Sequence, residues 1–109
     1  MANISTRSRY RLEAIGNNRA ELSGRGVYVL FSYGAPVAAH LEGYGAARLY
    51  PSPSKTTSQH INQWLERHGL TAWRAVKVGQ GDLDDLLDSP AGVRKMERLI
   101  EAARAAQPE

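Results

Sequence analysis

The histidine at position 60 is the side chain whose neighbours most suggest chemistry. It follows the run Thr56-Thr57-Ser58, where a hydroxyl group can cap the start of a helix. A histidine beside Thr57 and Ser58 at a helix N-terminus could bind phosphate or act as a general base. We favour the structural alternative, in which His60 supports the cap or packs on a sheet. No carboxylate or second histidine lies at catalytic spacing.

Ser32 and Tyr33 extend this candidate site. They would join His60 only if the helix packs over the end of the strand that contains them. No serine lies in a nucleophile-elbow pattern, so we predict no catalytic residue. The candidate polar site is therefore Ser32, Tyr33, Thr57, Ser58 and His60.

Metal ligation and cofactor binding are not predicted. The chain has no cysteine and three histidines. His60 and His68 lie about 12 Å apart along one predicted helix, too far to share an ion. His40 lies in a different predicted element, and His68 ends an apolar helical stripe, which favours packing.

Arginines and aromatic rings form a second candidate site, on a sheet. In the predicted strands they occupy the positions opposite the apolar ones, so aligned strands would give one basic, solvent-facing surface. Several single-strand binders hold phosphates and stack bases in this way. The alternative is an ordinary solvated face, because three glutamates are interleaved. The candidate nucleic-acid-binding residues are Arg7, Arg9, Arg11, Arg19, His40, Arg48 and Tyr50.

The first half of the chain, which contains most of these residues, is predicted to form strands. Alternation or β-branched and aromatic runs predict strands over Arg9–Ile15, Arg19–Ser23, Val27–Tyr33, Val37–Glu42 and Ala46–Tyr50. Glycine and asparagine turns separate them at regular spacing, which favours an antiparallel meander. Val27–Tyr33 is apolar on both faces and is predicted to be the central strand.

Helices dominate the second half. A helix capped by Thr57 or Ser58 is predicted to end at Gly69, and Thr71–Val78 could add a strand. Two more helices are predicted over 82–88 and 92–106, the second after a Ser89-Pro90 start. The fold class is α+β, a meander of about five strands followed by a helix and one or two C-terminal helices packed on one sheet face.

The last helix carries an apolar stripe of Val93, Met96, Leu99, Ile100 and Ala103. We expect it to cover the chain's own sheet, since a single sheet layer needs such a cover. Homodimerisation through this helix is the alternative.

Length and composition limit the protein class. The 109 residues fit one domain, 1–109, with 1–8 as a flexible arm. The formal charge of +3 is far below that of a protein that coats nucleic acid. No signal peptide or membrane span is visible, and the lack of cysteine fits a reducing compartment, so we expect a cytoplasmic protein.

Two patches resemble small proteins of phages and other mobile elements. The patches are Ser32-Tyr33-Gly34-Ala35-Pro36-Val37-Ala38 and Thr56-Thr57-Ser58-Gln59-His60-Ile61-Asn62-Gln63-Trp64-Leu65. The resemblance covers Val27–Leu65 and implies a genomic context and a strand-then-helix order, with no chemistry attached.

The leading functional hypothesis is a non-enzymatic accessory protein of a mobile element that binds nucleic acid through the basic sheet face and N-terminal arm. The second is an inhibitor or adaptor that binds a host protein. The third is a small enzyme with His60 as its base.

Overall fold

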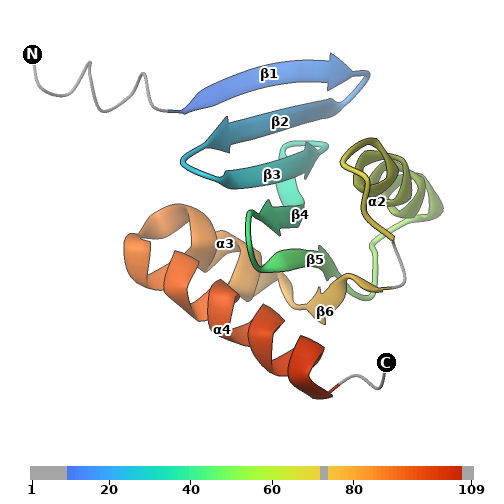
Figure 1. The fold of residues 1–109 in the computed structure, drawn as a ribbon. Coiled ribbons are helices and arrows are strands. Elements are labelled where there is room, and N and C mark those ends of the chain that lie inside the picture. The colour runs from blue at the N-terminus through green and yellow to red at the C-terminus, as the bar shows by residue number, and fades with distance from the viewer. Residues whose placement is uncertain (1–9, 72–73, 107–109) are drawn as a thin grey trace, which may run out of the picture.

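The computed structural model describes residues 10–71 and 74–106 of the chain. Within these ranges the elements are β1 (Arg11–Gly16), β2 (Arg19–Gly24), β3 (Val27–Ser32), β4 (Ala35–Leu41), β5 (Gly45–Leu49), α2 (Lys55–Arg67), β6 (Val76–Val78), α3 (Gln80–Asp88) and α4 (Pro90–Ala106). The strands form one sheet in the order β1 to β6 (Figure 1). Strands β1 to β5 are an antiparallel meander, which confirms the predicted α+β architecture.

Tight turns with positive backbone φ angles connect the first strands. Arg25 and Gly26 have φ angles of 54° and 78° between β2 and β3, and Tyr33 and Gly34 have 52° and 82° between β3 and β4. Consecutive residues of positive φ form the hairpin turn whose twist matches that of the strands. As a result, Tyr33 stands at the tip of a turn, where its side chain is 59% exposed.

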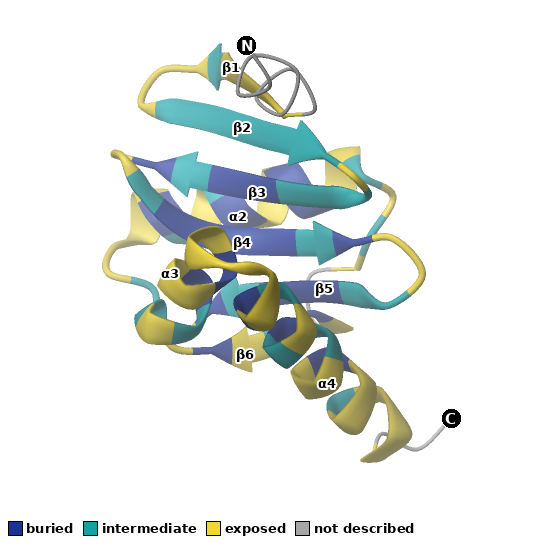
Figure 2. Ribbon diagram, turned by 90° about the vertical axis from the view of Figure 1, so that its left-hand side faces the viewer, coloured by how far each residue is buried: buried dark blue, intermediate teal, exposed yellow. Residues whose placement is uncertain are grey.

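The helices lie on both faces of the sheet. Helix α2 covers one face, and α3 with α4 covers the other (Figures 1 and 2). Leu30 pairs with Ala38 on the α2 face, and Val29 pairs with Ala39 on the α3–α4 face. All four side chains are fully buried. This two-sided cover explains why β3 is apolar on both of its faces.

The start of α2 differs from the sequence expectation. Ser54, in extended conformation, is the cap, and its Oγ accepts a hydrogen bond from the Thr57 backbone N–H at 3.1 Å. The helix therefore begins at Lys55, and the expected caps Thr57 and Ser58 lie in its first turn. Several hydroxyl residues in a row offer the same capping chemistry, so the sequence does not separate them.

The strand expected over Thr71–Val78 is shorter, because β6 covers Val76–Val78. It pairs with β5 in parallel, with Lys77 beside Arg48. A strand that follows a helix crossing over the sheet returns in the same direction as the strand before that helix. The β5–α2–β6 unit is therefore a crossover added to the meander.

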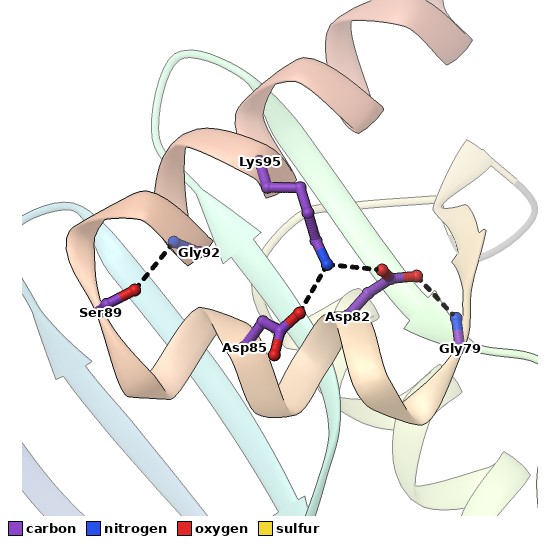
Figure 3. Close-up of polar contacts among 6 residues, drawn as sticks. All are labelled: Gly79, Asp82, Asp85, Ser89, Gly92 and Lys95. Carbon is purple, nitrogen blue, oxygen red and sulfur yellow. Dashed lines mark hydrogen bonds and ion pairs between the residues drawn. The ribbon is translucent and has the colours of Figure 1, made fainter.

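Helices α3 and α4 meet closely at Gly92. A Cβ atom at Gly92 would lie 1.8 Å from the carbonyl oxygen of Asp85, so only glycine fits there. The Lys95 ammonium lies 2.6 Å from Asp85 Oδ2 and 3.1 Å from Asp82 Oδ1 (Figure 3). Ser89 Oγ accepts from the Gly92 N–H at 3.3 Å, which confirms the predicted helix start.

The apolar stripe of α4 is used inside the fold. Met96 and Ile100 are fully buried in the core beneath α4, and Leu99 lies at the rim with 36% of its surface exposed. In the described ranges, no helix combines the length and hydropathy needed to cross a bilayer.

Candidate functional site

The end of β3 and the first turns of α2 are joined by polar contacts. Ser32 Oγ lies 2.9 Å from His60 Nδ1 and 3.5 Å from Thr57 Oγ1. Ser32 and Thr57 are each only 3% exposed. Helix α2 thus packs over the end of β3, which is the condition the sequence set for this polar site. Ser58 lies in the same helical turn, and its backbone N–H bonds to Ser54 O.

The Ser32–His60 pair does not present a nucleophile to solvent, since the Ser32 hydroxyl is buried. Burial and, to a lesser extent, the charge of Arg19 lower the pKa of His60 below its usual value. The folded state therefore favours the neutral imidazole. Its ring stacks on Tyr33 with centroids 5.9 Å apart. His60 thus links the buried strand end to an exposed aromatic ring.

A second exposed tyrosine lies at the same end of the sheet. Strands β3 and β5 point the same way because each is antiparallel to β4. Tyr33 follows β3 and Tyr50 follows β5, and their exposed fractions are 59% and 55%. Lys77 Nζ lies 4.3 Å from the centre of the Tyr50 ring. We call the surface formed by Tyr33, Tyr50, His60 and Lys77 the tyrosine end.

Two arginines flank α2. Arg19 NH1 donates to Gln63 Oε1 at 3.1 Å, and Arg48 NH1 donates to Asn62 Oδ1 at 2.9 Å. Burial lowers the pKa of Arg48 from its usual value. The Nε atoms of Arg19 and Arg48 are buried and have no hydrogen-bond partner among the described residues. Both side chains are therefore pinned beside the helix.

The sheet face expected to be open to solvent is covered. Arg19, His40 and Arg48 do share one face, as predicted, but α2 lies over it and leaves all three half-buried. Arg11 is exposed on β1 and lies 3.8 Å from Glu13. The other two expected members, Arg7 and Arg9, lie outside the described residues. The covered face is not an open sheet surface of the kind that RNA-binding sheets use.

A groove opens beside the tyrosine end, between the tip of the β1–β2 hairpin and α2. Its volume is about 430 Å³, and its lining residues are Ile15, Arg19, His60, Gln63, Trp64, Glu66 and Arg67. His60 belongs both to this groove and to the tyrosine end. Two guanidinium groups and one carboxylate line the groove, so its balance of charge is positive.

The other two histidines belong to an aromatic cluster under the second half of α2. Glu21 Oε1 accepts from Trp64 Nε1 at 2.6 Å and lies 2.8 Å from His68 Nε2. The His68 ring packs against Trp64 and Tyr28, with centroids 4.5 and 5.2 Å apart. His40 stacks on Tyr28 at 5.6 Å. These contacts fix the helix to the sheet.

The part of the chain that the structure describes contains no candidate metal-binding site. No group of three or more histidine, aspartate or glutamate side chains there could hold an ion. Glu21 is occupied by Trp64 and His68. Burial, and secondarily the neighbouring His68, lower the pKa of His40.

The sequence model of a family of unknown function, DUF8033, matches residues 5–79, which is more than half of the chain. The chain belongs to the DUF8033 family. The match is broader than the Val27–Leu65 segment that carried the sequence resemblance, and it takes in every strand and α2. No curated protein and no solved structure matches the chain.

All candidate residues of this DUF8033 protein lie in the matched region, and so does its excess of positive charge. Residues 5–79 contain 10 lysines or arginines and 4 acidic residues, whereas residues 80–106 contain 4 and 6. The charged residues of 80–106 lie in α3 and α4, which cover the sheet face opposite α2 (Figure 2).

Sequence reasoning missed the roles of three residues, two at the candidate site and one in the aromatic cluster. Arg67 lines the groove, Lys77 lies over Tyr50, and Glu21 anchors Trp64. Glu21 is one of the three interleaved glutamates that favour an ordinary solvated face in the sequence, together with Glu13 and Glu42. The i, i+4 spacing of Trp64 and His68 places the two rings side by side on one face of the helix, and the carboxylate that both contact lies far away in the sequence.

Proposed function

We propose that this DUF8033 protein binds single-stranded nucleic acid along the tyrosine end and the adjoining groove. The observation that carries the proposal is the pair of exposed tyrosines, Tyr33 and Tyr50, at one end of the sheet. The Tyr50 ring has the Lys77 ammonium over it, and the Tyr33 ring stacks on the imidazole of His60. Exposed aromatic rings combined with a positively charged groove are the usual means by which proteins bind single strands without reading their sequence.

The groove supplies the complementary half of such a site. Arg19 and Arg67 line it next to His60, so a strand whose base stacks on Tyr33 would bring its phosphates toward these two guanidinium groups. Contacts of this kind provide affinity and make it dependent on salt. The proposal thus replaces the open sheet face with an edge of the sheet and one side of α2.

The N-terminal arginines and the biological setting belong to the same proposal. Arg7 and Arg9, together with Arg11 at the start of β1, would contact the nucleic-acid backbone as a basic N-terminal segment. The two motif patches support a role as an accessory protein of a phage or other mobile element. Such a role places the protein in the cytoplasm, where the lack of cysteine is compatible with a reducing environment.

Fluorescence anisotropy with labelled single- and double-stranded oligonucleotides, at low and high salt, tests the proposal. Removing one stacking ring costs about 1–3 kcal/mol per base, so Tyr33→Ala with Tyr50→Ala should weaken single-strand binding at least about tenfold. The matched control is Tyr33→Phe with Tyr50→Phe, which keeps both rings and should retain affinity.

Three outcomes count against the proposal. An absence of binding at low salt would overturn it and leave the host-protein hypothesis, for which a pull-down from host lysate is the next step. Equal loss of affinity in the alanine and phenylalanine pairs would show that stacking is not the mode of binding. Binding that is indifferent to salt would exclude phosphate contacts.

A further inference from the structure

The first strand is an exposed edge of the sheet. Strand β1 pairs with β2 on one side only, and in the described ranges no element pairs with its other side. Its residues from Arg11 to Ala14 are all exposed, and Leu12 presents 69% of its surface. An unpaired strand edge offers main-chain donors and acceptors to another strand, and natural edges are usually shortened, covered or interrupted by proline. Within the described residues, β1 is six residues long, contains no proline and pairs on one side only. Its edge carries the charged side chains Arg11 and Glu13 and an irregular register between Ala14 and Gly16.

The residues of this edge are complementary to themselves. In an antiparallel pair of two β1 strands centred on Leu12, each Arg11 lies opposite Glu13 of the second copy. Leu12 then faces Leu12 across the two-fold axis, and Tyr10 faces Ala14. Because side chains alternate along a strand, the two ion pairs fall on one face and the apolar contacts on the other.

We propose that two copies of this chain associate through β1, antiparallel and centred on Leu12, to form one continuous sheet. A second copy fits this edge because, in this register, every exposed residue from Tyr10 to Ala14 lies opposite a complementary residue of the second copy. A two-fold interface requires such self-complementarity of a single patch. In the isolated chain, Arg11 and Glu13 are 3.8 Å apart and largely exposed, so each is free to turn toward the second copy. The other sheet edge, β6, has only three residues and offers a shorter ladder.

Charge reversal tests the register. Arg11→Glu places carboxylates opposite Glu13 of the second copy at both symmetric positions, and Glu13→Arg does the same with guanidinium groups. Each variant should weaken self-association at least about tenfold in sedimentation velocity over a range of concentrations. The two variants mixed together should form a heterodimer, because every opposed pair is then of opposite charge.

Arg98→Glu is the matched control, since Arg98 is exposed on α4, away from β1, and its reversal should leave self-association unchanged. A wild-type chain that stays monomeric at all concentrations overturns the proposal. A dimer that Arg11→Glu weakens no more than Arg98→Glu also overturns it, as does a mixture of the two reversed variants that fails to associate. The measurements use protein free of nucleic acid, so they do not depend on the proposed function.

Discussion

Ser32 and His60 form the contact that fixes α2 to the sheet at the tyrosine end. The Ser32 hydroxyl is buried at the end of β3, and its Oγ lies 2.9 Å from His60 Nδ1. The same imidazole stacks on the exposed ring of Tyr33. A buried anchor and an exposed aromatic surface thus share one histidine, and the position of α2 controls the shape of the proposed binding surface.

The substitution His60→Ala should therefore destabilise the fold. It leaves the buried Ser32 hydroxyl with only the longer contact to Thr57, and an unsatisfied buried group costs about 1–3 kcal/mol. Thermal unfolding should show a Tm lower by several degrees, and Gln59→Ala, at an exposed neighbour in the same helix, should leave Tm unchanged. An unchanged Tm in His60→Ala would contradict this structural role and leave His60 with a role in binding or, under the enzyme hypothesis, as a base.

Acid should destabilise the protein through His40 and His60. Burial lowers the pKa of both, so the folded state favours the neutral imidazole, while the unfolded state binds protons near pH 6.5. The unfolded state then binds more protons as pH falls through that value, and the free energy of unfolding decreases. Urea unfolding between about pH 7.5 and about pH 5.5 should show this loss.

The variant His40→Phe isolates the contribution of His40. Phenylalanine can still stack on Tyr28 but cannot bind a proton. It also removes the buried Nδ1 atom that has no partner among the described residues. The acid-induced loss of stability should be smaller in His40→Phe than in the wild type. Identical losses in the two proteins would mean that His40 does not contribute. The titratable groups that influence His40 are His68 and Glu42.

The sequence was sufficient for the strands and insufficient for the position of α2. Val27–Tyr33 was recognisable as central because both of its faces are apolar, and β3 indeed has helices over both faces of the sheet around it. The same alternation rule failed for Glu21 and Arg19, which look solvated in sequence. Both lie beneath or beside α2 because Trp64 and Gln63 supply hydrogen bonds to them.

The remaining differences have local causes. Several consecutive hydroxyl residues compete to cap α2, and the geometry of Ser54 decides among them. Strand β6 has three residues, too few to show alternation, and its pairing with β5 depends on where α2 returns the chain. The groove and the Lys77–Tyr50 contact join residues that are distant in sequence, so no pattern of spacing predicts them.

The glycines of α3 and α4 allow a matched test of helix packing. Gly92→Ala puts a methyl group against the Asp85 carbonyl, which is backbone and cannot move away without separating the helices. We expect a loss of about 3 kcal/mol in the free energy of unfolding. Gly81→Ala is the control, because nothing lies within 4 Å of its added methyl group. A helical Gly-to-Ala change there should stabilise by up to about 1 kcal/mol. Equal effects of the two substitutions would mean that α3 and α4 are not in close contact at Gly92.

The salt dependence of binding should identify the phosphate contacts. Arg67 is exposed and lines the groove beside His60, so Arg67→Ala should weaken binding equally for all oligonucleotide sequences. It should also reduce the magnitude of the slope of log affinity against log salt by about one, the contribution of one phosphate contact. Arg94→Ala removes another exposed arginine, on α4 over the opposite face of the sheet, and should leave the slope unchanged. If both variants lower the slope alike, the effect comes from the net charge of the protein, and the groove is not where the phosphates bind.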